Sequence, residues 1–315
     1  MKKAINNALY YILFSFWYCI SLLPLGILYL FSDFLYLLIY HVAHYRRKVV
    51  EENIDRSFPD APAQLRKKYV KDFYLHFGQL VCETIWFSHT TPRRMASSKI
   101  VSVVHPEETS RLQSAAPGTI VLAGHYANWE ILFGFEHFDL PPGSEACYAL
   151  KRSNVAMVYK KLSSPLWDEI FRECRLRLLG TDFENYIESA NILRHVVEHR
   201  NDGYFYFFDT DQRPYAGAKA VMDVEFMGQK AQTMYAGAGV AHKYGLAVAY
   251  FSMRRKPSGR GYECEMKTIC DNASKMEVKD IMNEFYRLLE EDIRRDPGGY
   301  LWSHRRWKQV NKRTI

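Results

Sequence analysis

The sequence predicts an α/β protein with a mostly parallel sheet and helices on both faces, preceded by an N-terminal membrane helix or helical hairpin. Short apolar runs alternate with longer segments of helical periodicity, which is typical of strands joined by crossover helices. One run, Tyr204–Phe208, is wholly apolar, as expected of a central parallel strand. The N-terminus differs from the rest, because Ala4–Val42 contains a single charge, Asp33.

The N-terminal run is long enough for a membrane anchor, since a spanning helix needs about 20 apolar residues. Pro24 and Gly26 divide it, so we expect one crossing with a second, membrane-lying helix, or a hairpin. It lacks the cleavage site of a signal peptide. A buried hairpin in a soluble core is the alternative. The division expected is an anchor over residues 1–45 and one domain over residues 46–315. Two lysines precede the run and a heavier basic flank follows it, so the domain should face the cytoplasm: Arg46, Arg47, Lys48 and Arg56.

The predicted domain begins with a helical segment over residues 60–90, where apolar residues recur every three to four positions. The β-branched, apolar Thr119–Ala123 reads as a buried strand, with a short helix over Trp129–Phe133 after it. The remaining elements are expected in this order: a strand around Ala146–Leu150, helices Val155–Cys174 and Phe183–His199, the strand Tyr204–Phe208, a helix carrying Met234–Lys243, a hairpin of Ala247–Met253 and Gly261–Lys267, and a helix Lys279–Arg295.

A candidate catalytic pair follows the strand Thr119–Ala123. His125 falls in the loop after the strand, and Glu130 lies five residues later, in the first turn of a helix for which Asn128 is a plausible N-cap. A carboxylate there is close enough to orient the imidazole, as a general base for a hydroxyl requires. The alternative is a capped helix with a hydrogen-bonded loop histidine, because the spacing alone proves little.

Further blocks accompany this HxxxxE pattern along the chain. They are Arg46-Arg47-Lys48 with Glu52-Asn53-Ile54 and Phe58-Pro59; Asp211-Gln212 with Val224-Glu225-Phe226-Met227-Gly228; Arg254-Arg255-Lys256; and the stretch Tyr300–Lys308. In this order they resemble the lipid A late acyltransferases, the bacterial lauroyl/myristoyl transferase branch of the glycerolipid-type acyltransferases. The resemblance runs from about residue 40 to 310. Two departures are Glu225, where the family has proline, and Asp209 as a rival for the family aspartate; Asp211 is preferred because Gln212 follows it.

The resemblance implies a glycerolipid acyltransferase-like fold in the bacterial inner membrane. The implied reaction moves a fatty acyl chain from a thioester of acyl carrier protein or CoA to a hydroxyl of a lipid A precursor. His125 would be the general base and Glu130 the group that fixes its tautomer, with no cofactor and no metal. Backbone N–H groups or an arginine would meet the oxyanion. The expected substrate-binding residues are Arg152, Arg177 (in an Arg-x-x-Gly pattern), Asp211 and Gln212.

Composition agrees with this interpretation and narrows it. The net charge of +7 over 315 residues suits an anionic bilayer and an acidic carrier protein. Nucleic-acid binding fits poorly, because the aromatics lie in apolar runs. The six cysteines show no CxxC pair, and no GxSxG occurs. Three alternatives stay open: an acyltransferase for a lysophospholipid or another glycolipid, a thioesterase, and a non-catalytic lipid-binding protein.

Overall fold

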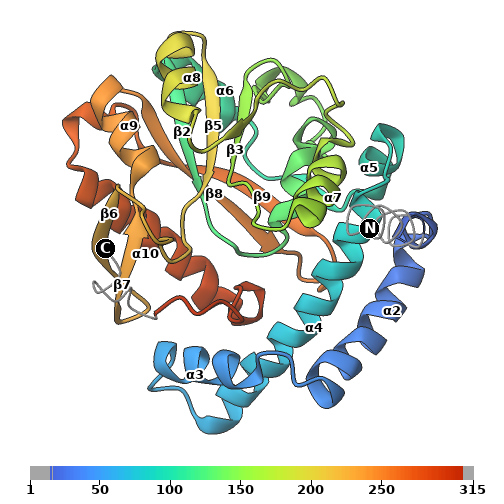
Figure 1. Cartoon of the computed structure of the whole chain (residues 1–315). Coiled ribbons are helices and arrows are strands. Elements are labelled where there is room, and N and C mark those ends of the chain that lie inside the picture. The colour runs from blue at the N-terminus through green and yellow to red at the C-terminus, as the bar shows by residue number, and fades with distance from the viewer. Residues whose placement is uncertain (1–14, 16, 308–315) are drawn as a thin grey trace, which may run out of the picture.

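The fold is that of the predicted α/β class, with a seven-stranded sheet flanked by helices, in a computed structural model that describes residues 15 and 17–307 (Figure 1). The strand order is β1-β9-β8-β2-β5-β3-β4, and neighbours pair in parallel except β8 and β9. A separate antiparallel hairpin holds β6 and β7. The strands are β1 Val101–Val103, β2 Gly118–Ala123, β3 Val155–Tyr159, β4 Tyr186–Glu188, β5 Tyr204–Asp209, β6 Val221–Phe226, β7 Gln229–Met234, β8 Ala247–Arg255 and β9 Tyr262–Cys270.

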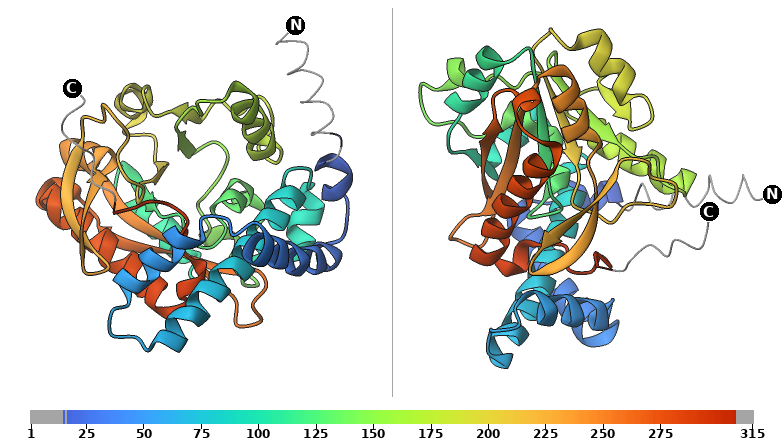
Figure 2. Two further views of the ribbon diagram at one scale, coloured as in Figure 1. Left: turned by 60° about the horizontal axis from the view of Figure 1, so that its bottom comes forward. Right: turned by 90° about the vertical axis from the view of Figure 1, so that its left-hand side faces the viewer.

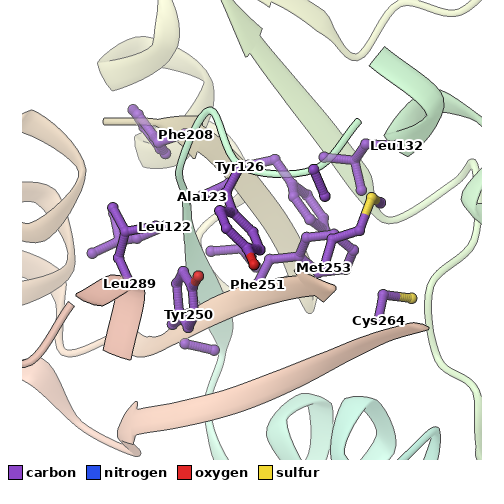
Figure 3. Packing of buried hydrophobic residues seen from close by; sticks show 14 of the residues in the cluster. Leu122, Ala123, Tyr126, Leu132, Phe208, Tyr250, Phe251, Met253, Cys264 and Leu289 are labelled. Atoms are coloured by element: carbon purple, nitrogen blue, oxygen red, sulfur yellow. The ribbon is translucent and has the colours of Figure 1, made fainter. Parts of the chain in front are cut away.

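The central strand β2 carries the candidate histidine at its carboxyl end. All six of its residues are buried, because β5 and β8 pair on either side of it. Leu122 and Ala123 lie in the apolar core beside Tyr250 and Phe251 of β8 (Figure 3). A strand held on both edges and packed on both faces gives the following loop a rigid base.

The helices of the described chain are α2 Leu25–Leu37, α3 Arg47–Ser57, α4 Ala63–Phe87, α5 Pro92–Ser98, α6 Glu107–Ala115, α7 Pro165–Leu176, α8 Ile192–His199, α9 Ala236–Tyr244 and α10 Val278–Arg295. Three helices of the domain, α4, α9 and α10, match predicted ones, whereas α3, α5 and α6 were not predicted. A π-helical turn, Leu38–Val42, continues α2. Short 3₁₀ segments cover Trp129–His137, Glu145–Cys147, Ala273–Lys275 and Pro297–Gly299.

The middle of the chain differs from the sequence-based expectation. The predicted strand around Ala146–Leu150 is wrong, since that region holds a 3₁₀ turn and extended chain. The predicted helix Val155–Cys174 divides into β3 and α7, and Phe183–His199 divides into β4 and α8. β3 and β4 are three to five residues long and carry mixed side chains, so pairing with β5 defines them more than local pattern does.

Helix α2 packs along α4 by one face and exposes the other (Figure 1). Close approach depends on Gly78 of α4, where an added Cβ would lie 2.8 Å from the carbonyl oxygen of Ser32. The outer face is apolar, with Leu30 67% and Phe34 64% exposed. The stretch Leu25–Val42 is long and apolar enough to cross a membrane. The first half of the expected anchor lies mostly outside the described residues.

Candidate active site

His125 and Asp211 form the centre of the site, at the carboxyl ends of neighbouring parallel strands. The β2–β5 register pairs Ala123 with Asp209, so the residues two positions beyond each strand lie side by side. The backbone N–H of Thr210 donates to the carbonyl of Ala123 at 3.0 Å and extends the pairing past the strand ends. Nδ1 of His125 then lies 2.6 Å from Oδ1 of Asp211. Between the two aspartates that the sequence left open, it is Asp211 that contacts the imidazole.

The pair is nearly shielded from water, with side-chain exposures of 14% for His125 and 2% for Asp211. Burial by itself lowers the pKa of His125, but the charge and hydrogen bond of Asp211 outweigh it and raise the pKa to about 9. Burial likewise opposes ionisation of Asp211, yet the neighbouring imidazolium lowers the pKa of this carboxyl. Because Nδ1 is engaged, Nε2 is the ring atom left for a substrate.

Glu130 does not orient His125, and that expectation is wrong. Both Glu130 oxygens accept hydrogen bonds from Arg175, at 2.8 Å from Nε and 2.7 Å from Nη2. Nη1 of Arg175 donates to the hydroxyl of Tyr186 at 3.2 Å. Although burial raises the pKa of Glu130, the charge and hydrogen bonds of Arg175 lower it below the usual value. Glu130 is therefore an anion beside His125 that is held by an arginine.

The segment after helix α10, residues 297–307 and here called the C-terminal segment, forms backbone hydrogen bonds with the loop that carries His125. Tyr126 forms an antiparallel bridge with Tyr300, and the N–H of Leu301 donates to the carbonyl of His125 at 3.1 Å. The N–H of Ala127 donates to the carbonyl of Gly299 at 2.9 Å. Ala127 has a φ of +59°, which a non-glycine residue keeps only when its surroundings hold it. The C-terminal segment thus supports the histidine loop through backbone hydrogen bonds.

The first and last sequence blocks meet in space. Nδ2 of Asn53 donates to the carbonyls of Trp302 and His304, each at 2.8 Å. Nη1 of Arg46 donates to the carbonyl of Ser303 at 3.0 Å. In Figure 2 (left), helix α3 lies against the C-terminal segment. Asn53 is buried, so these bonds fix the segment that supports His125.

Asn128 is not the helix cap that the sequence suggested, because its side chain makes no capping hydrogen bond and the segment after it is a 3₁₀ helix. Instead Nδ2 of Asn128 donates to buried Glu83 at 2.9 Å. Glu83 also accepts hydrogen bonds from Tyr29 of α2 and Tyr262 of β9. Burial raises the pKa of Glu83 despite these three donors. This carboxyl joins helix α2 to the histidine loop.

Within the described chain, no hydrogen bond or ion pair joins the side chains of the other expected substrate-binding residues, Arg152, Arg177 and Gln212, to the His125–Asp211 pair. Arg152 pairs with Asp182 at 2.8 Å and lines a cavity that also holds Glu136 and Glu184. Arg177 lies two residues beyond Arg175, and residues at that helical spacing point in different directions; it lines a cavity with Ser88, His89 and Gly180. Gln212 is half-buried beside Asp211. Substrate contact by these three residues stays a prediction.

Sequence reasoning missed the role of Arg175. Its sequence signal was weak, since Arg175 and Arg177 both lie near the end of an expected helix and only the helix phase separates them. Among the described residues, no group of three or more metal-ligating side chains comes together to hold an ion. The site thus consists of two neighbouring acid–base contacts: Asp211 contacts His125, and Glu130 contacts Arg175.

A buried histidine that contacts a carboxylate, placed at the carboxyl ends of parallel strands, is an arrangement with which an enzyme can activate a hydroxyl or a water. The profile of the family described as "Bacterial lipid A biosynthesis acyltransferase" matches residues 2–309. The "Lipid A biosynthesis lauroyltransferase" of Escherichia coli (strain K12) is 24% identical over 305 residues, covering 92% of each chain. The chain belongs to the bacterial lipid A biosynthesis acyltransferase family, and it is an acyltransferase that acts on lipid A.

Proposed function

We propose that this enzyme transfers a fatty acyl chain from a thioester to a hydroxyl of a lipid A precursor, with His125 as the general base. The observation that carries the proposal is the 2.6 Å contact between Nδ1 of His125 and Asp211. It leaves Nε2 to accept a proton while the carboxylate stabilises the imidazolium that forms. The donor thioester would be that of an acyl carrier protein or CoA.

The proposed reaction balances without a covalent enzyme intermediate. As Nε2 takes the proton of the acceptor hydroxyl, its oxygen attacks the thioester carbonyl carbon. The tetrahedral intermediate then collapses, the C–S bond breaks, and the leaving thiolate takes the proton back from Nε2. Arg175 donates three hydrogen bonds to Glu130 and Tyr186 and retains two further N–H groups. It is our candidate for stabilising the oxyanion, together with backbone N–H groups near Trp129.

The neutral imidazole is the form that accepts a proton, and the raised pKa of His125 makes that form scarce at neutral pH. At pH 7, a pKa of about 9 leaves on the order of 1% of the imidazole neutral in the free enzyme. We therefore expect kcat/KM to rise with pH up to about 9. A profile flat between pH 6 and pH 9 would contradict the assignment of His125 as the base.

We propose that helix α2 lies in the membrane interface and holds residues 46–315 at the cytoplasmic surface. The support is the way α2 packs, because one of its faces contacts α4. The other face exposes a row of large apolar side chains, Leu30, Phe31, Phe34 and Leu37. A helix packed along the domain in this way presents its apolar stripe to the acyl boundary of a bilayer. Leu30→Glu with Phe34→Glu should release the enzyme from liposomes. Full retention of the double variant would refute this membrane contact.

The direct test of function is acylation with purified enzyme. A lipid A precursor and a radiolabelled acyl thioester should give acylated precursor, and mass spectrometry should locate the chain on a hydroxyl. His125→Ala should lower the rate by about 10²–10⁴, the usual contribution of a general base. Retention of more than a tenth of wild-type activity would remove His125 from this role. Preference for a lysophospholipid, with the lipid A precursor neither acylated nor inhibitory, would instead assign the lysophospholipid as the acceptor.

A further inference from the structure

A surface cavity of about 440 Å³ lies between helix α3 and the C-terminal segment. Its walls combine three cations with one acid and the half-buried ring of Trp307. The polar and charged lining residues are Lys48, Glu52, Asn53, Arg56 and Arg305. Trp307 is fixed there, since its indole N–H donates to the carbonyl of Phe226 at 3.3 Å. The cavity therefore has a positively charged rim and an indole ring anchored in its wall.

The three cations of this cavity have no acidic partner within the described part of the chain. Lys48, Arg56 and Arg305 are exposed, and none comes within ion-pair distance of a described carboxylate. Arg47, the neighbour of Lys48, is different because it pairs with Glu51 at 2.8 Å. Cations gathered in a concave surface raise the local positive potential and attract anions. Residues 308–315 contain lysine and arginine but no aspartate or glutamate.

The cavity is linked to both the histidine loop and the apolar helix. Its lining residue Asn53 donates to the carbonyl of His304 at 2.8 Å, and Leu301, four residues before Arg305, donates its N–H to the carbonyl of His125 at 3.1 Å. Lys48 comes six residues after Val42, where the apolar stretch ends. Six residues span at most about 20 Å, so Lys48 lies within that distance of the end of the apolar stretch. With α2 in the membrane interface, as proposed above, the rim lies within reach of lipid headgroups.

We propose that this cavity binds a phosphate group of the acceptor lipid and so holds its hydroxyl at His125. The proposal rests on the proposed function and names a subsite for it. Arginine and lysine are the side chains that recognise phosphate through charge-assisted hydrogen bonds. A membrane lipid is favoured over a soluble donor because Lys48, which lines the cavity, comes six residues after the end of the apolar stretch. The alternative ligand is a phosphate of a CoA or carrier-protein donor, and the test distinguishes it from the acceptor.

The test compares the variants Lys48→Ala, Arg56→Ala and Arg305→Ala with the full-length wild type in neutral detergent. The acceptors are a phosphorylated lipid A precursor and the same lipid after enzymatic dephosphorylation. For the phosphorylated acceptor, KM should rise about tenfold per variant while kcat changes by less than about twofold, since the lost contact is made equally in the ground and transition states. For the dephosphorylated acceptor, wild-type KM should already be high and the variants should not raise it further. Inorganic phosphate should inhibit the wild type competitively and the variants about tenfold less.

The matched control is Arg287→Ala, which removes one exposed cation of α10 that pairs with Glu284. Its KM should equal that of the wild type. Equal KM values for wild type and all three cavity variants, or equal rises for both acceptors, would overturn the phosphate subsite. A rise in KM for the acyl donor alone would overturn the assignment to the acceptor. Loss of binding to anionic vesicles without a change in KM would assign the cavity to bulk lipid and also overturn it. Absence of all acylation by the wild type would refute the proposed function instead. The subsite would then be tested by calorimetric titration of the wild type and the three variants with inorganic phosphate, and equal binding by all four would overturn it.

Discussion

Replacing Asp211 by asparagine tests the catalytic pair most directly. Asp211 and its surroundings raise the pKa of His125 from 6.5 to about 9. A rise of this size corresponds to about 3 kcal/mol of preference for the imidazolium. The same preference stabilises the imidazolium in the transition state, so its loss should cost about 10² in kcat/KM at pH 9 and above, where the wild-type base is largely neutral, and more where the wrong tautomer forms.

The pH profile separates this role from a loss of folding. Without the carboxylate, burial opposes the imidazolium with less compensation, so the pKa of His125 falls and the acid limb of kcat/KM should move to lower pH. The wild type gains neutral base as pH rises toward 9, whereas the variant gains less over that range because more of it is already neutral at pH 7. The ratio of wild-type to variant activity should therefore grow between pH 7 and pH 9. Asp209→Asn is the matched control, because Asp209 acts on His125 through charge without a hydrogen bond to it. A variant that keeps a third of wild-type activity at pH 9, with an unmoved acid limb, would refute the reasoning.

Three further outcomes follow from other contacts. Glu130→Gln should lower the free energy of unfolding by about 3 kcal/mol, because it leaves buried Arg175 without its counter-charge. The acid limb of its kcat/KM profile should stay nearer that of the wild type than the limb of Asp211→Asn does. An unchanged free energy of unfolding in a denaturant titration of Glu130→Gln would contradict the pairing with Arg175. Gly78→Ala should loosen helix α2 and increase its proteolysis, whereas Gly26→Ala, where the added Cβ meets nothing within 4 Å, should not; equal cleavage of both would refute the close packing. Asn53→Ala removes two hydrogen bonds to the C-terminal segment and should cost about 1–3 kcal/mol in thermal unfolding, and an unchanged melting temperature would count against that link.

The catalytic pair also makes stability depend on pH. The folded pKa of His125 is raised to about 9, above its unfolded value near 6.5. Its contribution is thus fully present below pH 6.5 and is lost as pH rises through 9. The wild type should lose part of its advantage over Asp211→Asn across that range. An advantage that stays constant from pH 6.5 to pH 9.5 in urea titrations would contradict the ion pair.

Several elements could be predicted because local sequence alone defines them. The apolar runs Thr119–Ala123 and Tyr204–Phe208 specify buried strands, and β2 and β5 coincide with them within a residue. The helix Lys279–Arg295 has a strong amphipathic period and differs from α10 by one residue. In contrast, β3 and β4 are short, and their hydrogen bonds to neighbouring strands decide their conformation.

The sequence by itself determined the α/β class, the loop position of His125 and the apolar N-terminus, because these depend on period and composition along the chain. Only the tertiary structure decided which acid contacts the histidine. Glu130 is five residues away in the chain, and Asp211 is 86, yet the parallel register of β2 and β5 brings Asp211 to Nδ1. Helix α7 then presents Arg175 to Glu130. Which charged groups meet depends on strand order and helix phase, and neither is encoded in the spacing of a motif.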